Sequence, residues 1–319
     1  MALSEFELIQ TYFNRSNEAA DPDILLGIGD DCAILRPKPG QDLLLSIDTL
    51  IEGVHFPQGT AAYQLGWRSL AVNLSDLAAM GAQPAWFTLA LALPDSDEGW
   101  LSEFSRGLFD LADQHQIRLI GGDTTRGPLS ITIQVHGYTP TGKALRRDGA
   151  LAGDTLYVTG FPGEAGAGLR RIQQGGYTDT DHLIRRFYQP RPRLAFAQSI
   201  RDLAHSAIDI SDGLLADIGH ILERSGVGAC VDVDAIPCSA QLVAAEGTVE
   251  ALRLALTAGD DYELCFTAAV QHDAQIMHHA QACQLPVTRI GAITFEPGLN
   301  MINASGNPVD MEGRGYQHF

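Results

Sequence analysis

The sequence is poor in cysteine, in basic residues and in long apolar runs, and each shortage excludes a class of protein. Its five cysteines form no C-x-x-C pair, so we expect a reducing compartment and no disulfide scaffold. Lys and Arg number 21 against 39 Asp and Glu, and the net charge of −18 argues against nucleic-acid or anionic-membrane binding. No apolar run could span a bilayer, and the first residues do not resemble a secretory signal. We therefore expect a cytoplasmic protein.

The composition is otherwise that of an ordinary globular protein. It has 319 residues, of which 45% are hydrophobic and 19% charged, which is enough for two domains. A loop with glycine and arginine precedes a new strand–turn–helix pattern after Asp154. This change predicts a domain boundary near residue 150, with one domain at 1–150 and a second at 151–319.

Hydrophobic periodicity predicts a mixture of helices and strands in both halves. A capping box, Ser4-x-x-Glu7, predicts a first helix to about Phe13 with Phe6, Leu8, Ile9 and Phe13 on its apolar side. Further helices are expected at 63–80, 98–116, 192–204, 213–224 and 271–284. Strands are expected at 43–48 (buried, with Asp48 at its end), 86–93, 117–120, 129–138, 155–158, 206–210, 229–233, 262–267 and 287–293.

Aspartates in apolar surroundings are the most informative feature. Asp30 and Asp31 follow Gly27-Ile28-Gly29, and single aspartates recur at Asp48, Asp76, Asp123, Asp209 and Asp212. One acidic pair alone could be a solvated surface feature. Two carboxylates 4 Å apart repel by about 4 kcal/mol at the effective dielectric of a protein site, so several of them together predict a bound cation. Oxygen ligands of this kind favour Mg²⁺, Mn²⁺ or Ca²⁺ over zinc.

The helix expected at 63–80 carries a polar line in an apolar sequence. Ser69, Asn73 and Asp76 recur at spacings of four and three, so they lie on one face. The line can serve the acidic site, or it can form a hydrogen-bonded seam with another helix. Both interpretations remain open at this point.

Two glycine-containing segments imitate nucleotide-binding motifs. Residues 137–144 nearly match G-x-x-x-x-G-K-[ST], but Ala144 stands where a hydroxyl is needed, and no apolar helix follows. The glycines of 160–168 follow a strand, but their spacing is not that of a dinucleotide fold. We expect close helix packing there, and no phosphate-binding loop in either segment.

The motifs taken together resemble thiamine-monophosphate kinase. The resemblance is carried by Gly27–Asp31, Asp48-Thr49-Leu50, Asn73–Ala82, Gly121–Thr124, Asp209–Leu214 and Gly259–Leu264, and it extends to Gly315–Phe319. This family belongs to the ATP-binding superfamily of aminoimidazole ribonucleotide synthetase and selenophosphate synthetase. The resemblance implies an α/β plus α+β protein, with an N-terminal mixed-sheet, ATP-binding domain that pairs in a homodimer and a C-terminal α+β domain.

The resemblance also implies an activity, namely metal-assisted, in-line transfer of the ATP γ-phosphoryl group to thiamine monophosphate. By similarity the metal ligands are Asp31, Asp48, Asp76, Asp123, Asp209 and Asp212, assisted by Ser46 and the backbone of Ile47; Asp31, Asp48, Asp76, Asp209 and Asp212 would be catalytic. ATP would contact Gly122, Asp123, Arg147 and Ser211, and thiamine monophosphate would contact His55, Asp260 and Tyr316. Relatives commonly have Glu at the position of Asp260, and Trp also occurs at the position of Tyr316.

Three alternatives use similar acidic residues. Another ATP-using ligase or synthetase of the superfamily would share the aspartates, and ATP with each candidate acceptor would separate the two. A two-metal phosphatase would act without nucleotide. A Ca²⁺-binding module should carry D-x-[DN]-x-[DN]-G-x₅-E, which is absent from this chain.

Overall fold

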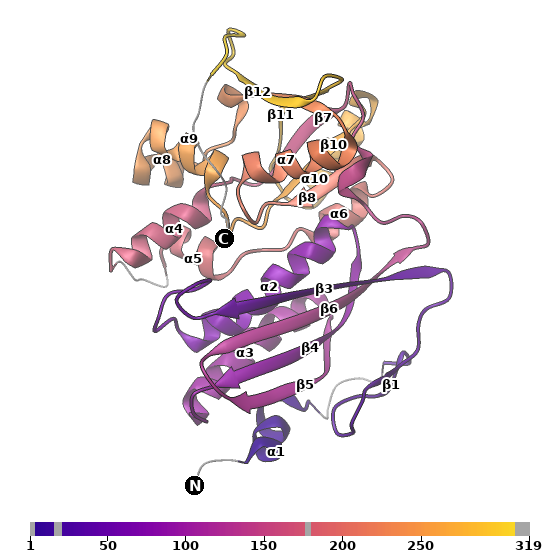
Figure 1. Cartoon of the computed structure of the whole chain (residues 1–319), viewed down its shortest axis with the longest axis vertical. Coiled ribbons are helices and arrows are strands. Elements are labelled where there is room, and N and C mark those ends of the chain that lie inside the picture. Colours follow the sequence, from indigo (N-terminus) through magenta and orange to yellow (C-terminus); the bar gives the residue numbers. More distant parts are fainter. Residues whose placement is uncertain (1–3, 16–20, 176–179, 310–319) are drawn as a thin grey trace. The chain divides into compact units, whose positions relative to one another are not determined.

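The computed structural model describes residues 4–15, 21–175 and 180–309. The chain divides into two compact units, the first comprising residues 1–77 and 83–142, the second residues 78–82 and 143–319. Each unit combines a sheet with helices, which confirms the expected α/β plus α+β class (Figure 1). The functional assignment of residues 1–150 and 151–319 stays a prediction.

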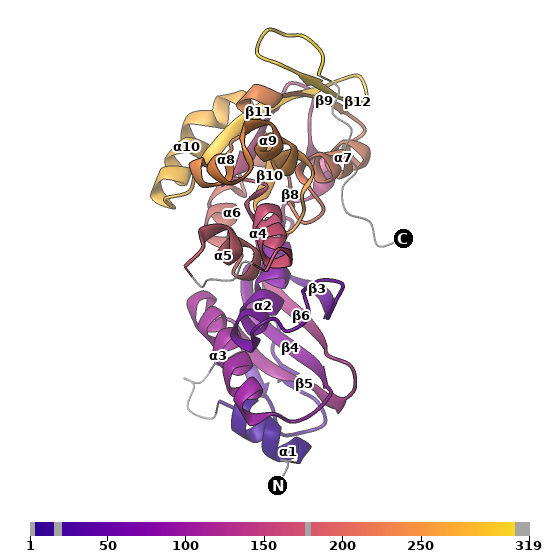
Figure 2. The ribbon, with the colours of Figure 1, turned by 90° about the vertical axis from the view of Figure 1, so that its left-hand side faces the viewer.

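The first unit is built on a four-stranded mixed sheet with the strand order β3-β6-β4-β5. Its strands are β3 (Gln41–Ile51), β4 (Gln83–Leu93), β5 (Arg118–Arg126) and β6 (Ser130–Pro140). Only β4 and β5 are parallel to each other, and the helix α3 (Glu98–His115) makes the crossover that such a pair requires. Figure 2 shows α3 and α2 (Ala62–Ala79) on the same face of this sheet.

The buried face of this sheet explains why most residues of α2 are apolar. Leu70, Leu74 and Leu77 of α2 have at most 1% of their surface exposed. Phe87 of β4 and Ile133 of β6 are completely buried on the sheet. An eighteen-residue helix that must cover such a sheet needs apolar residues at most positions, so the few polar ones stand out.

The N-terminal segment departs from a regular helix. The Ser4–Glu7 capping box is present, but α1 covers only Glu5–Leu8 and continues as a π-helical turn, Ile9–Phe13. The i→i+5 spacing of that turn places Leu8 and Phe13 on one buried side. The prediction for Phe6 is wrong, because its side chain is 80% exposed. A short ladder of β1 (Ile24–Leu26) and β2 (Ile34–Leu35) follows.

Two strands differ from their expected form. The strand predicted at 43–48 extends over all of β3, and Leu43, Leu45 and Ile47 are 41%, 55% and 59% exposed, so a fully buried strand is wrong. As β3 is an edge strand with one face covered by α2, alternate side chains face outward. The strand predicted to end at Ile120 continues through Gly121–Asp123 to Arg126, because it pairs along its length with β4.

The second unit contains a six-stranded sheet with the order β12-β9-β11-β7-β10-β8, in which only β12 and β9 are parallel. Its strands are β7 (Thr155–Thr159), β8 (Ala204–Asp209), β9 (Gly228–Asp232), β10 (Leu264–Ala268), β11 (Val287–Thr294) and β12 (Gly298–Ile302). Helix α7 (Leu214–Ser225) packs Leu214, Ile218 and Ile221 into the core of this sheet.

The remaining helices of this unit are mostly short. They are α4 (Glu164–Gln173), α5 (His182–Tyr188), α6 (Leu194–Ile200), α8 (Ala240–Glu246), α9 (Thr248–Thr257) and α10 (Asp273–Ala282), with 3-10 turns η2 (Arg147–Gly149), η3 (Val233–Ala235) and η4 (Val270–His272). The helix predicted at 192–204 is shorter than expected, and α5, α8, α9 and β12 were not predicted. Seven-residue helices span about two turns, which is too short for a clear periodic pattern.

Three smaller predictions can be compared with the structure. All five cysteines are free thiols, as expected. Close packing explains two glycines of 160–168, since a Cβ at Gly163 or Gly168 would lie 2.5 Å or 2.1 Å from a neighbouring backbone atom. Among the described residues, no helix is long and apolar enough to cross a membrane.

Candidate active site

The polar line of α2 faces strand β3. The backbone N–H of Asp48 donates to Oδ1 of Asn73 at 3.1 Å, and the hydroxyl of Ser46 donates to the carboxylate of Asp76. Asn73 is completely buried and donates from Nδ2 to the carbonyl of Ser69 at 2.9 Å. The alternative of a helix–helix seam is therefore wrong for these bonds, because α2 uses them to fix the part of β3 that carries Asp48.

The electrostatics of this cluster suit a cation. Burial, and next the carboxylate of Asp76, raise the pKa of Asp48 to about 6. A carboxylate that ionises less readily because of a second carboxylate is stabilised by positive charge. The nearby donors are carboxylate and hydroxyl oxygens, which are the hard ligands that Mg²⁺ prefers. The residues Ser46, Asp48 and Asp76 thus fit a divalent cation of this type.

A second acidic group lines a cavity of about 550 Å³ within the first unit. Its lining includes Asp30, Asp31, Gly121, Gly122 and Asp123, together with Ile9 and Phe13 of the N-terminal turn. Asp30 accepts the N–H of Asp31 at 2.8 Å, so it stabilises its own turn while Asp31 is exposed. The cavity therefore brings the predicted residues Asp31, Gly122 and Asp123 together, although the sequence suggested more apolar surroundings for both aspartates.

The structure explains why glycine is required at position 122, which the sequence patterns did not reveal. Its φ is +153°, and a Cβ there would lie 1.8 Å from the carbonyl oxygen of Leu89. Any other residue would push β5 away from β4 at the wall of the cavity. The ATP contact predicted for Gly122 stays a prediction.

Strand register separates Asp48 from Asp123. Asp123 pairs with Ala90, Ala90 with Thr132, and Thr132 with Thr49, so these residues form one cross-strand row. The hydroxyls of Thr49 and Thr132 lie 2.8 Å apart, which confirms that they share a face. Because neighbouring side chains on a strand alternate, Asp48 points to the opposite face, toward α2. The structure thus places the predicted metal ligands of this unit on both faces of the sheet.

In the second unit, two loops lie side by side at the ends of β8 and β10. Asp209 is buried at the end of β8 and pairs with Leu264. Beyond it the N–H of Asp260 donates to the carbonyl of Ser211 at 2.9 Å, and the N–H of Tyr262 donates to that of Ile210 at 2.9 Å. This pairing brings the predicted residues Asp209, Ser211, Asp212 and Asp260 into one region.

The backbone of the 259–263 loop adopts an uncommon conformation. Asp260 has φ 69° and Tyr262 φ 51°, values that non-glycine residues reach at a cost of about 1 kcal/mol or more each. Between them Asp261 is fully buried, and its two carboxylate oxygens accept the N–H groups of Gly163 (2.6 Å) and Ala165 (3.1 Å) at the start of α4. These bonds hold the loop in place.

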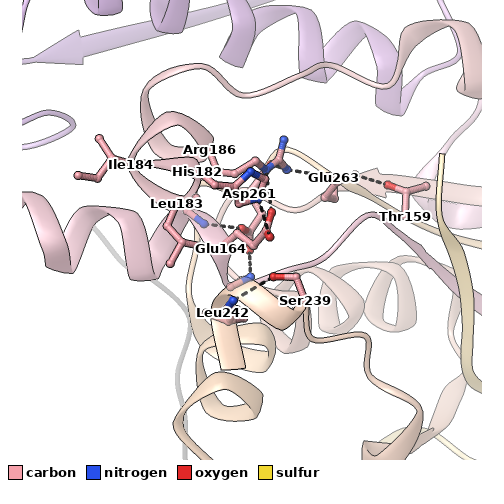
Figure 3. A network of polar contacts seen from close by, with 12 residues as sticks. Thr159, Glu164, His182, Leu183, Ile184, Arg186, Ser239, Leu242, Asp261 and Glu263 are labelled. Carbon is pink, nitrogen blue, oxygen red and sulfur yellow. Dashed lines mark hydrogen bonds and ion pairs between the residues drawn. The ribbon is translucent and has the colours of Figure 1, made fainter. Parts of the chain in front are cut away.

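Buried ion pairs also hold this loop, and Figure 3 shows Arg186, Glu263 and Thr159 among their residues. Glu263 accepts Arg186 Nη2 at 2.7 Å, Arg193 Nε at 2.6 Å and the hydroxyl of Thr159 at 2.6 Å. Burial opposes ionisation of Glu263, but Arg193, Arg186 and Thr159 outweigh it and lower the pKa to about 2. Arg186 also contacts Glu164 at 3.2 Å. Glu263 is therefore ionised at neutral pH, with Arg186 and Arg193 as its counter-charges.

Arg147 and His55 also belong to the predicted site. Arg147 lies in the η2 turn with an exposed side chain, whereas its neighbour Arg146 is paired with Asp148. His55 follows β3, and its Nδ1 accepts the N–H of Ile51 at 3.0 Å. In a neutral ring this bond places the proton on Nε2, which makes that nitrogen a donor.

Comparison with known proteins identifies the family. Residues 29–139 match the N-terminal domain, and residues 152–302 the C-terminal domain, of AIR synthase related proteins. Over 324 aligned residues, 100% of the chain and 99% of the relative, the chain is 48% identical to a thiamine-monophosphate kinase of Salmonella typhimurium. The chain belongs to the thiamine-monophosphate kinase family. The resemblance inferred from the motifs is thereby confirmed, and the protein is a kinase.

Solved structures agree with the fold of this kinase. A thiamine-monophosphate kinase from Stenotrophomonas maltophilia, 50% identical, superimposes with a TM-score of 0.87 and covers 94% of this chain and 97% of its own. AaThiL, solved in complex with AMPPCP and TMP, is 29% identical, with a TM-score of 0.77 and coverage of 89% of both chains. The fold of this chain is thus shared with a relative that was solved in complex with AMPPCP and TMP.

Sequence reasoning missed several residues that hold the 211–213 segment and the 259–263 loop of the candidate site. Asp217, on α7, is 1% exposed and accepts three backbone N–H groups of the 211–213 segment. Arg186 and Arg193 neutralise Glu263. The spacing of Asp217 from Asp212 could have indicated the role of Asp217. The two arginines could not be found in this way, because they are about 70 residues away from Glu263 in the sequence. Tyr316, predicted to contact thiamine monophosphate, lies outside the described residues.

Proposed function

We propose that this chain transfers the γ-phosphoryl group of ATP to thiamine monophosphate, giving thiamine diphosphate and ADP. The observation that carries the proposal is the cluster of Ser46, Asp48 and Asp76, an oxygen-rich site in a chain whose relatives are thiamine-monophosphate kinases. Support for the substrates comes from AaThiL, which was solved with AMPPCP and TMP. Because AMPPCP resembles ATP in shape and charge, its presence in that complex supports ATP as the phosphoryl donor.

The proposed cofactor is Mg²⁺, in more than one position. When bound, it would neutralise the phosphates of both substrates, which would otherwise repel each other and the aspartates. Candidate ligands are Asp31, Ser46, Ile47 (by its backbone), Asp48, Asp76, Asp123, Asp209 and Asp212. The raised pKa of Asp48 supports this choice for the β3–α2 cluster, because a cation there would favour the ionised carboxylate.

Basic and polar side chains complete the proposed assignment. Arg147 offers an exposed guanidinium to the ATP phosphates, and the hydroxyl of the partly exposed Ser211 is a second proposed ATP contact. His55 can donate from Nε2 to the acceptor phosphate, since its Nδ1 is already an acceptor. Asp260, held by its loop, and Tyr316 complete the proposed thiamine-monophosphate contacts.

The reaction is proposed to be a single in-line displacement. An oxygen of the thiamine monophosphate phosphate forms the new bond to the γ-phosphorus while the bond to the β–γ bridging oxygen breaks, and ADP leaves with that oxygen. The protein's part is to orient the two phosphates and to offset their charge. No covalent enzyme intermediate is needed.

Acceptor choice tests the proposal. Free thiamine shares the rings of thiamine monophosphate but lacks the phosphate oxygens that would attack the γ-phosphorus. We expect it to inhibit weakly and to turn over at under about one per cent of the rate, because the missing contacts develop in the transition state. Steady-state kinetics with both acceptors at saturating MgATP measure this.

The same assay separates the alternatives. Comparable turnover of free thiamine would mean another acceptor class. Phosphate release without nucleotide would favour a two-metal phosphatase, and ATP consumption only with an amide or selenide acceptor would favour a ligase of the superfamily.

We further propose that the first unit pairs with a second copy of the chain. The edge strand β3 is eleven residues long and exposes Leu43, Leu45 and Ile47, a surface that native proteins normally cover. Analytical ultracentrifugation of the wild type should give a mass of twice the 34.3 kDa of one chain. The Leu45→Asp variant should give a mass closer to that of a single chain. A monomeric wild type would contradict this proposal without affecting the kinase assignment.

A further inference from the structure

In the second unit, the buried carboxylate of Asp217 binds the backbone of a segment that contains predicted site residues. Oδ2 of Asp217 accepts the backbone N–H groups of Ser211 (3.1 Å), Asp212 (3.2 Å) and Gly213 (3.1 Å). Its side chain lies in the first turns of α7, and the residue is only 1% exposed. Three consecutive N–H groups therefore converge on a single oxygen.

These N–H groups precede α7 or cap its start, so no backbone carbonyl of the helix accepts them, and their acceptor is the side chain of Asp217. A buried N–H left without an acceptor costs about 1–3 kcal/mol, so the segment would rearrange if the oxygen were removed. The opposite side of the segment is also fixed, since the carbonyl of Ser211 accepts the N–H of Asp260. The backbone of 211–213 is thus held from both sides.

The fixed segment carries side chains that the proposed function uses. Ser211 and Asp212 are both partly exposed, although their N–H groups are directed to Asp217 in the interior. With the backbone amides turned inward, the orientation of these two side chains depends on the acceptor at Asp217. A substitution at Asp217 should therefore weaken nucleotide binding by displacing the side chains of Ser211 and Asp212.

We propose that Asp217 is a positioning residue for MgATP, which acts by holding the 211–213 backbone so that Ser211 and Asp212 can contact the nucleotide and its metal. The inference rests on the proposed function for the identity of the ligand. It requires an acceptor oxygen at this position, and it does not require that Asp217 touch ATP or the metal.

The test compares Asp217→Ala, which removes the acceptor, with Asp217→Asn, which keeps one carbonyl oxygen for the three N–H groups. We expect Asp217→Ala to raise the KM for MgATP about a hundredfold, and the Kd for MgATP measured by calorimetry without acceptor by a similar factor. The KM for thiamine monophosphate should change less than threefold. Asp217→Asn should recover at least a tenfold part of the lost nucleotide affinity.

Asp181→Ala is the matched control. One oxygen of Asp181 accepts the N–H groups of Leu183 (2.9 Å) and Ile184 (3.3 Å) at the start of α5, which carries no predicted ATP contact. This control should lower the melting temperature without changing the ratio of the two KM values. A control that raises the KM for MgATP as much as Asp217→Ala would overturn the proposal, because the effect would then be general destabilisation.

Two other outcomes would also contradict it. A folded Asp217→Ala that binds MgATP like the wild type would show that the acceptor is dispensable. If Asp217→Ala does not fold, Asp217→Asn decides alone, and a folded Asn variant with a hundredfold loss of affinity would overturn the proposal. The calorimetric measurement needs no turnover, so failure of the wild type to phosphorylate thiamine monophosphate would count only against the proposed function.

Discussion

Two groups of carboxylates, one in each unit, are buried in very different ways. Asp48 in the first unit is acted on by burial and by a second carboxylate, and its pKa rises to about 6. Glu263 in the second unit is buried more deeply, yet its pKa falls to about 2 because two arginines and a hydroxyl contact it. Two buried carboxylates thus have pKa values that are shifted in opposite directions.

The difference lies in where the positive charge comes from. Glu263 obtains its counter-charge from Arg186 and Arg193, so its interactions are complete within the folded chain. At Asp48 the charge that acts on the carboxylate is that of Asp76, which raises its pKa, and the groups that fix the geometry, Asn73 and Ser46, are neutral. We infer that the Glu263 network supports the fold and that the Asp48 cluster is arranged for a ligand cation.

The largest expected effect is that of Asp76→Asn on activity. The variant keeps the size of the side chain and an oxygen for the Ser46 hydroxyl, but it loses the charge that the proposed metal requires. We expect turnover to fall about a thousandfold, or about 4 kcal/mol of transition-state stabilisation, while the melting temperature is unchanged or higher. Kinetics and thermal unfolding on the same preparation measure both.

Asp42→Asn is the control for this substitution. Asp42 is an exposed carboxylate of β3 that accepts the N–H of Gly142 at 2.8 Å, and its loss should leave turnover nearly unchanged. If Asp76→Asn unfolded the protein while activity per folded molecule survived, the Asp48 cluster would be structural, and the contrast between the two units would disappear.

An effect of similar size is expected for Glu263→Gln, now on stability. Removing the carboxylate charge leaves two arginines facing a neutral amide in the interior, which should cost about 3–5 kcal/mol in the free energy of unfolding. The control Glu250→Gln also faces two arginines, Arg170 and Arg253, but its side chain is 33% exposed. Solvent screening should limit its cost to about 1 kcal/mol or less.

The pH dependence gives a second measurement of the Glu263 network. Because its folded pKa lies below the unfolded value of 4.5, the stabilisation is present above that pH and is lost as pH falls toward about 2. Urea denaturation of the wild type between pH 5 and pH 2.5 should therefore show a decline that is smaller in Glu263→Gln. Equal slopes would show that the arginines do not stabilise the ionised form.

The smallest of these effects concerns removal of divalent metal. If the first unit relies on external cations, ATP should bind more than tenfold more weakly in the presence of a chelator, which is at least about 1.4 kcal/mol. Calorimetric titrations with Mg²⁺ and with chelator, at matched ionic strength, measure this difference. An unchanged affinity would mean that protein side chains such as Arg147 bind the nucleotide by themselves.

Local patterns predicted much of this protein correctly. The Ser4–Glu7 capping box, the helix that ends before Gly81 and the helix at 98–116 are all present, since caps and apolar periodicity act within a few residues. The acidic motifs were enough to indicate the kinase family. Family membership was therefore readable because its motifs are short and contiguous.

Other features depended on partners far away in the sequence. The exposed side chains of β3 follow from its place at the sheet edge, and the extension of β5 follows from its pairing with β4. The opposite faces of Asp48 and Asp123 follow from register across four strands. None of these can be obtained from apolar content, because an apolar strand looks the same at an edge and in the middle of a sheet.

The amino-acid sequence sets which residue types are available, namely aspartates in glycine-rich and apolar segments and few basic residues to oppose them. Which of the carboxylates receive a protein counter-charge depends on the folded chain. Arg186 and Arg193 reach Glu263 across about 70 residues, and Asp217 turns back onto the segment just before its own helix. Charge compensation is a matter of distances between side chains, and only the folded chain sets those distances.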